Sequence, residues 1–163
     1  MKGRMSEART SVIGALLVAI GPISMALYTP AMPELAHAFD TDPALVKLSL
    51  SLYFAGFAVT QLVCGPLSDA LGRRRTTVIF MILYIAGALV AVLASTIGWL
   101  LAARLLQGVG ASVGVATARA IVRDQFTGEA SSRIMSTIGM ILALGPAIAP
   151  TIGGFTLALA GWH

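Results

Sequence analysis

The side chains best suited to chemistry in this chain are the few polar ones that interrupt long apolar runs. Arg104 lies about five residues after Trp99 in such a run, and Gln107 follows on roughly the same face of a helix. An arginine inside a membrane span costs about 2.5 to 3.5 kcal/mol, so Arg104 is expected to face the bundle interior, water or an acidic partner. Gln107 could hydrogen-bond to Arg104 or to a ligand. The alternative is that Arg104 snorkels to the edge of the membrane.

A second group of charged residues lies in the stretch Gly65 to Arg75, which joins two apolar runs. Asp69 can accept hydrogen bonds from backbone N–H groups at a helix start or pair with an arginine, and Arg73 can bridge to another carboxylate. Gly72 is expected to relieve strain in the turn. Because only a few residues turn the chain, the two flanking helices are predicted to be antiparallel neighbours. The alternative is that the three arginines of this stretch only set topology.

Other reactive residue types are sparse or badly spaced for catalysis. The single Cys64 excludes an intrachain disulfide, and His37 and His163 show no ligand spacing, so no metal site is predicted. There is no nucleophile–base pair and no glycine loop suited to phosphate, so an enzyme is not expected. Basic side chains gather at the ends of apolar runs without interleaved aromatic residues, so nucleic acid is not an expected partner.

The elements that position these residues are predicted to be membrane helices. Only 11% of the residues are charged and 57% are hydrophobic, with a mean hydropathy of +0.88, whereas about 25% are charged in an ordinary globular domain. The lipid bilayer is therefore the expected partner of an all-α integral membrane protein. Crossing its core takes about 20 helical residues. Five predicted spans lie near residues 12–35, 46–68, 76–95, 99–122 and 134–160.

The basic residues predict the orientation of these spans. All but two of them fall on the side of the N-terminus, which is therefore predicted to be cytoplasmic. The opposite side carries only Lys47, and Arg104 lies inside the membrane. The residues on the predicted cytoplasmic side are Lys2, Arg4, Arg9, Arg73, Arg74, Arg75, Arg119, Arg123 and Arg133.

Three stretches resemble sequence patterns of major facilitator superfamily transporters, each in the corresponding span. GPLSDALGRRR (65–75) resembles the loop between the second and third helices of that family. LLAARLLQGVGA (100–111) resembles its fourth-span pattern, and GPAIAPTIGG (145–154) resembles a fifth-span pattern of antiporters. YTPAMP (28–33) and ARAIVRD (118–124) further resemble the bicyclomycin and chloramphenicol resistance branch of drug:proton antiporters.

The resemblance implies a fold and a setting. Such transporters consist of two six-helix bundles, with the substrate near the midplane between them. Residues 1–163 would then be a truncated N-terminal bundle, whose partners include the missing C-terminal helices, and the chain alone is not expected to transport. The implied location is the bacterial inner membrane, as a multi-pass protein.

The resemblance also implies roles for individual residues. Asp69, Arg73 and Asp124 would form a charge network that closes the inward side, within a gating motif that includes Gly65 and Gly72. Arg104 and Gln107 would take part in proton coupling or shape the substrate cavity, with protons as coupling ion and no other cofactor. Met25 and Tyr28 could line a drug cavity, although each could equally be ordinary packing. The antiporter-type helix would bend and pack through Gly145, Pro146, Pro150, Gly153 and Gly154.

Three departures from the family pattern keep alternatives open. Ala26 stands where the drug-resistance branch commonly has an acidic residue, Ala70 replaces a basic residue, and Ala149 replaces a central glycine. The primary interpretation is proton-coupled efflux of small amphipathic drugs by alternating access. The alternatives are a major facilitator exporter of a metabolite or sugar, and a non-transporting membrane remnant.

Overall fold

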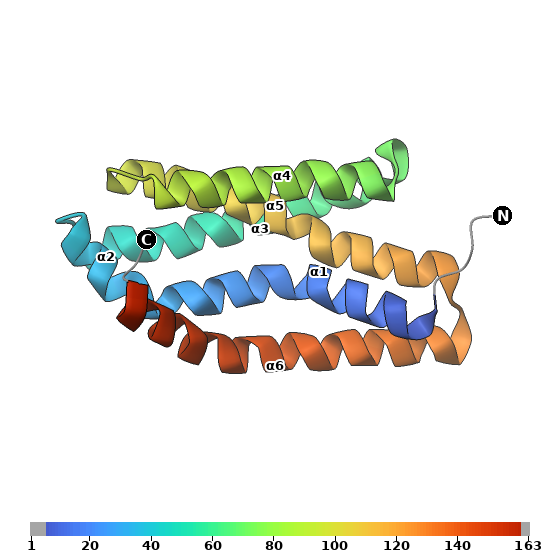
Figure 1. Cartoon of the computed structure of the whole chain (residues 1–163). Coiled ribbons are helices and arrows are strands. Elements are labelled where there is room, and N and C mark those ends of the chain that lie inside the picture. The colour runs from blue at the N-terminus through green and yellow to red at the C-terminus, as the bar shows by residue number, and fades with distance from the viewer. Residues whose placement is uncertain (1–5, 161–163) are drawn as a thin grey trace.

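The computed structural model describes residues 6–160, and this part of the chain is folded into helices joined by short connections. Figure 1 shows the long helices lying alongside one another as one bundle. Five segments are long and apolar enough to cross a membrane, which confirms the predicted all-α fold with five spans. The elements are α1 (Glu7–Tyr28), the 3₁₀ turn η1 (Thr29–Ala31), α2 (Met32–Ala38), α3 (Pro43–Leu71), α4 (Arg73–Val92), α5 (Ile97–Gln125) and α6 (Gly128–Ala160).

The first predicted span, near residues 12–35, lies within the helical segment Glu7–Ala38, which consists of more than one helix. The α-helix ends at Tyr28, and η1 and α2 follow it directly. Pro30 and Pro33 lie in the first turns of η1 and α2. Proline lacks an N–H group and is tolerated at such starting positions. The two prolines therefore account for the change of helix type at this end of the span.

The stretch Gly65 to Arg75 was expected to be a loop, and the structure corrects this expectation. α3 continues to Leu71 and α4 begins at Arg73, so Gly72 alone separates the two helices. Its φ of 88° lies in a region that residues with a Cβ rarely adopt. One glycine is thus sufficient to reverse the chain, and most of the charged motif is helical.

α5 lies at the centre of the bundle and is the most enclosed helix (Figure 1). α3 and α4 each pack mainly against α5 and contact each other over a shorter stretch, so the prediction that they are direct neighbours was incomplete. The reason is that α5 carries glycines on several faces. A Cβ at Gly108 would lie 2.0 Å from a backbone oxygen of α3, one at Gly110 2.5 Å from a backbone nitrogen of α4, and one at Gly114 2.0 Å from a backbone oxygen of α1.

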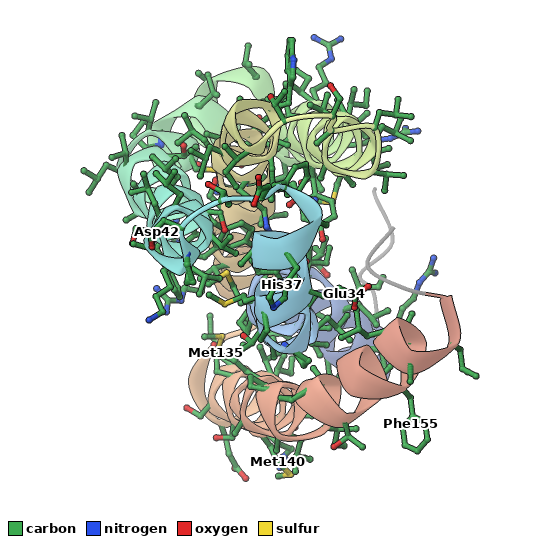
Figure 2. The ribbon with its side chains drawn as sticks, turned by 90° about the vertical axis from the view of Figure 1, so that its left-hand side faces the viewer. Glu34, His37, Asp42, Met135, Met140 and Phe155 are labelled. Atoms are coloured by element: carbon green, nitrogen blue, oxygen red, sulfur yellow. The ribbon has the colours of Figure 1, made fainter. Side chains whose placement is uncertain are left out.

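The outer surface of the bundle is apolar. Leu62, Leu93 and Leu159 are each about four fifths exposed, and in Figure 2 Phe155 points outward from α6. A soluble monomer rarely exposes such a continuous apolar surface. The multi-pass membrane setting explains it, because these side chains would contact lipid.

The two ends of the bundle differ in charge. The start of α1, the α3–α4 turn and the α5–α6 connection lie at one end (Figure 1), together with seven of the described basic residues. Glu34, His37 and Asp42 lie at the other end, which faces the viewer in Figure 2. Lys2 and Arg4 lie outside the described residues. The predicted gathering of basic residues at one end is therefore present in the fold.

Candidate functional site

The first candidate site is a charge cluster at the end that carries the α3–α4 turn. Arg73 Nη1 lies 2.7 Å from Asp69 Oδ1, and Arg73 Nε lies 3.2 Å from Asp124 Oδ2. Nη1 also donates to Ser68 Oγ at 3.2 Å. One guanidinium at the start of α4 therefore joins the end of α3 to the end of α5.

This cluster is partly open to solvent. Asp69 and Asp124 are 60% and 47% exposed, so each ion pair contributes modestly to stability. Its geometry suits a contact that opens and closes reversibly, since separating solvated ion pairs costs little free energy. Arg74 and Arg75 are exposed and form no ion pair within residues 6–160, in line with a topological role.

The structure brings three of the five predicted gating residues together and leaves one apart. Asp69, Arg73 and Asp124 are in contact, and Gly72 forms the turn beside them. Gly65 lies one helical turn before Asp69, and a Cβ there would have no atom within 4 Å. Sequence reasoning missed Ser68, although its position beside Asp69 was a usable signal.

The second candidate site surrounds Arg104, which is only 5% exposed. Its Nη1 donates to Gln107 Oε1 at 2.8 Å. Its guanidinium carbon lies 3.4 Å from the centre of the Tyr28 ring, so the cation is stacked on the aromatic face. Arg104 therefore does not snorkel to the membrane edge, and the aromatic face and Gln107 hold it inside the bundle.

Hydroxyl groups hold the aromatic rings of this site in place. Ser49 donates its hydroxyl proton to the Val46 carbonyl, so Tyr28 is the donor in the 2.7 Å hydrogen bond between Tyr28 and Ser49. On the other side, the hydroxyls of Ser24 and Tyr84 are hydrogen-bonded and connect α1 to α4. The stacking partner of Arg104 is thus anchored to α3.

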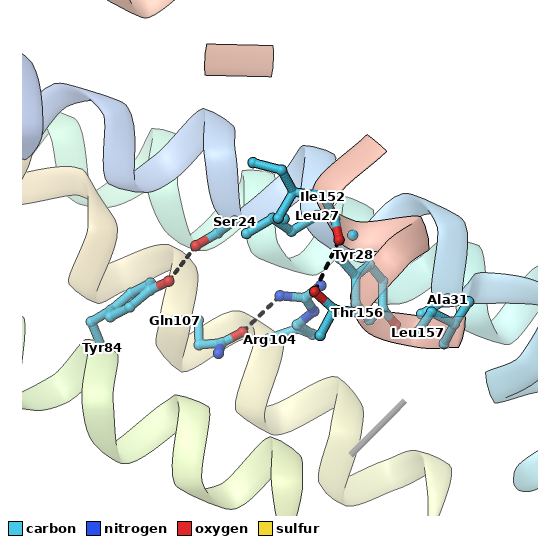
Figure 3. Close-up of a pocket in the computed structure, with 11 residues that line it drawn as sticks. Ser24, Leu27, Tyr28, Ala31, Tyr84, Arg104, Gln107, Ile152, Thr156 and Leu157 are labelled. Carbon is cyan, nitrogen blue, oxygen red and sulfur yellow. Dashed lines mark hydrogen bonds between the residues drawn. The ribbon is translucent and has the colours of Figure 1, made fainter. Parts of the chain in front are cut away.

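Arg104 lines a cavity of about 380 Å³ between α1, α4, α5 and α6. Figure 3 shows the hydroxyls of Ser24 and Tyr84, the amide of Gln107 and the guanidinium gathered there. The wall therefore combines hydrogen-bonding groups with apolar surface. Its lining residues are Ser24, Leu27, Tyr28, Ala31, Tyr84, Arg104, Gln107, Ile152, Gly153, Thr156 and Leu157.

Arg104 has no counter-ion among the described residues. Nε and Nη2 are buried and have no hydrogen-bond partner among the described residues. The seven acidic residues all lie at helix ends, and the three ion pairs within residues 6–160 do not include Arg104. A buried cation without a counter-ion is costly, so this arginine is a candidate functional group.

Met25 does not share the cavity of Tyr28. It lines a separate cavity of about 450 Å³ between α1, α3 and α6, together with Tyr53, Phe54 and Phe57. The two residues predicted to form one apolar drug cavity therefore face different spaces. The Met25 cavity is the more apolar and aromatic of the two.

The antiporter-type segment packs against α1 through two of its three glycines. A Cβ at Gly153 would lie 2.5 Å from the Leu27 carbonyl oxygen, and one at Gly145 would lie 3.1 Å from Ile23. A Cβ at Gly154 would meet nothing within 4 Å. α6 remains helical through Pro146 and Pro150, and its C-terminal part is bent relative to the rest (Figure 1).

Sequence reasoning missed the polar residues that support the Arg104 cavity. Tyr53 is 1% exposed, and its hydroxyl donates to the Gly21 carbonyl oxygen at 3.2 Å. The centre of its ring lies 5.8 Å from the guanidinium carbon of Arg104. Ser24, Ser49 and Tyr84 form the hydroxyl pairs described above. Their signal was a tyrosine or serine within an apolar run, where an unpaired hydroxyl would be costly.

Comparison with known proteins gives consistent results across the chain. Residues 14–163 match the sequence profile described as Major Facilitator Superfamily. The chain is 41% identical to an uncharacterized MFS-type transporter, YdgK, of Bacillus subtilis (strain 168) over 99% of its length. It is 32% identical to a bicyclomycin resistance protein homolog of Haemophilus influenzae over 91%, and 32% identical to a chloramphenicol resistance protein of Pseudomonas aeruginosa over 98%.

The chain covers only part of each of these relatives. It spans 40% of the length of the Bacillus protein, 37% of the Haemophilus protein and 38% of the Pseudomonas protein. The relatives are transporters or resistance proteins by name, and none of the three is described as an enzyme.

Proposed function

Since the chain belongs to the major facilitator superfamily, we propose that it forms the first bundle of a secondary transporter that exports small amphipathic drugs in exchange for protons. The observation that carries the proposal is the match of residues 14–163, within a five-span bundle, to this family of transporters. The drug class is inferred from the names of the bicyclomycin and chloramphenicol resistance relatives.

The two candidate sites suit alternating access in different ways. The half-exposed cluster around Arg73 can open and close at the end of the bundle, while the buried Arg104 lines an open cavity between α1, α4, α5 and α6. Rocking of one bundle against another would change access to the second, and a shift of the ends of α3, α4 and α5 within this bundle would open the first. We assign gating to the Arg73 cluster, and substrate binding or proton coupling to Arg104 with Gln107.

The proposed location is the bacterial inner membrane, with the N-terminus in the cytoplasm. The gathering of basic residues at the end that carries the start of α1 supports this orientation. The remaining helices of the transporter are the proposed partner of this chain, because the chain spans about two fifths of its relatives.

The proposal is tested by drug susceptibility in an efflux-deficient bacterium that expresses the complete transporter containing this chain. We expect raised resistance to chloramphenicol or bicyclomycin, and loss of that resistance on addition of a protonophore. Arg104→Ala should abolish resistance, while Arg75→Ala, at an exposed position, should preserve it. Unchanged susceptibility despite normal membrane expression would exclude drug export.

A reconstituted system tests coupling and substrate class directly. In proteoliposomes with an imposed pH gradient, the complete transporter should move labelled chloramphenicol, and unlabelled bicyclomycin should compete. Competition by sugars or small metabolites without competition by drugs would favour the metabolite exporter. The 163-residue chain alone should give no flux.

A further inference from the structure

We propose that the Arg104 cavity binds a small organic carboxylate through one edge of the Arg104 guanidinium. The inference goes beyond the proposed drug export, whose two test drugs carry no carboxylate, by giving this cavity a ligand class of its own. Binding itself requires no transport, so the two proposals can fail separately. The inference stands on the unpartnered atoms, on the charge balance and on the lining of the cavity.

The unpartnered atoms of Arg104 lie on one edge of its planar head group. Nη1 is occupied by Gln107 and one face is in contact with the Tyr28 ring, whereas Nε and Nη2 have no hydrogen-bond partner among the described residues. The N–H groups of Nε and Nη2 point the same way and match the two oxygens of a carboxylate. A single carboxylate would therefore satisfy both orphan donors.

The charge balance indicates that this carboxylate comes from outside the chain. All seven acidic residues lie at helix ends, where three of them pair with Arg73 and Arg133. None is in the part of α1, α4, α5 or α6 that lines the cavity. An anion bound here would neutralise a buried positive charge without competition from a resident acid.

The rest of the cavity suits the body of a small organic acid. Its volume is about 380 Å³, and hydroxyls of Ser24, Tyr84 and Thr156 lie beside the apolar side chains of Leu27, Ile152 and Leu157 (Figure 3). A ring or branched chain would contact the apolar residues. Nε and Nη2 are covered in the present arrangement, so binding requires the flexible Arg104 side chain to rotate toward the cavity that it lines.

The test is a titration of the 163-residue chain with benzoate in nanodiscs of neutral phosphatidylcholine, followed by calorimetry. Benzamide and benzylamine, which are neutral and cationic analogues of similar size, are the matched ligands. We expect saturable benzoate binding, with the two analogues weaker by about tenfold or more because they cannot make the charge-assisted pair. Equal binding of benzoate and benzamide would overturn the proposal.

Substitutions of Arg104 and Gln107 test whether benzoate binds at the Arg104 guanidinium. Arg104→Lys keeps the charge but lacks the planar edge, so it should weaken benzoate binding by about tenfold. Arg75→Lys, at an exposed position, should leave it unchanged. If Arg104→Lys does not fold, Gln107→Glu provides the second variant: its carboxylate neutralises Arg104 from within, so benzoate binding should again weaken. Retained binding in a folded variant of either kind would contradict the assignment.

A peptide distinguishes a free acid from an acidic side chain of another membrane helix. The probe is a leucine-rich helix of about 20 residues with one central glutamate, compared with its glutamine counterpart in the same nanodiscs. Benzoate binding that the glutamate peptide does not displace supports the free acid. If the glutamate peptide binds and benzoate does not, the partner of Arg104 Nε and Nη2 is a carboxylate of another helix, and the small-acid proposal is overturned. Drug resistance in the absence of benzoate binding would leave the transport function standing.

Discussion

Arg104 remains inside the apolar bundle because its charge lies on the face of Tyr28 rather than beside a carboxylate. A desolvated cation–π contact contributes about 2 kcal/mol or more, which is comparable to the cost of placing an arginine in a span. The ring is held by the hydrogen bond from Tyr28 to Ser49. The aromatic face and the Gln107 amide are therefore the stabilising partners that the described residues supply.

Substitution of Tyr28 separates the contribution of the ring from that of its hydroxyl. Tyr28→Phe keeps the aromatic face and should lower the free energy of unfolding by about 1 kcal/mol, through loss of the Ser49 hydrogen bond. Tyr28→Leu also removes the stacking and should cost about 1 to 2 kcal/mol more. The measurement is unfolding in mixed detergent–SDS micelles. Equal losses for the two variants would mean that the ring face does not stabilise Arg104.

The Arg73 cluster should behave as one coupled unit. In double-mutant cycles, Arg73→Gln with Asp69→Asn and Arg73→Gln with Asp124→Asn should each give a coupling of about 0.5 to 1 kcal/mol in unfolding free energy. The pair Glu129 and Arg133, 3.0 Å apart and more exposed, is the matched control and should give less. If the coupling free energy of the Arg73 cycles is no larger than that of the control pair, the cluster does not act as one coupled unit.

Local spacing predicts some of these residue contacts and not others. Arg104 and Gln107 are three positions apart on α5, so helix geometry alone places them together. Asp69 and Arg73 are four positions apart but lie on α3 and α4, so their contact depends on the turn at Gly72. The stacking of Arg104 on Tyr28 joins two different helices, and no periodicity within either helix encodes it. The separation of Met25 from Tyr28 likewise depends on which neighbours cover each face of α1.

At the scale of elements, glycines decide which helices approach closely. Gly153 faces α1, whereas its neighbour Gly154 faces open space. Gly153→Ala should therefore force α6 away from Leu27 and destabilise the bundle by about 1 to 3 kcal/mol, since backbone atoms cannot yield as a side-chain end can. Gly154→Ala should be neutral or slightly stabilising, because alanine is the better helix former.

The two alanine variants are compared by thermal unfolding in detergent and by size-exclusion chromatography. Because the positions are adjacent on one helix, their difference reports the contact with α1 rather than helix propensity. Similar stabilities would show that the α1–α6 contact does not depend on close backbone approach.

Apolar run lengths and composition were sufficient to predict the five membrane helices, but not their ends. The stretch Gly65 to Arg75 contains several charged residues and two glycines, which favoured a loop. In the structure the charged side chains project from helices, and Gly72 alone supplies the turn. The central place of α5 depends on glycines on several of its faces, whose partners lie on three other helices.

At the scale of the whole molecule, the orientation in the membrane can be measured at the two ends of the bundle. In a Cys64→Ser background, His37→Cys and Ser132→Cys place single thiols at exposed positions near opposite ends. In whole cells, a membrane-impermeant maleimide should label the cysteine at 37, whereas the one at 132 should react only after permeabilisation. The reverse pattern would place the N-terminus outside the cytoplasm.

The packing of α1 has a consequence for the biogenesis of the protein. α1 contacts chiefly α5 and α6, and about 100 residues separate its end at Tyr28 from the start of α6 at Gly128. At about 5 to 20 residues per second, the ribosome needs roughly 5 to 20 s to make that interval. During this time the first helix emerges without its last partner, so its exposed glycines and polar groups must be shielded by lipid, by the insertion machinery or by a chaperone.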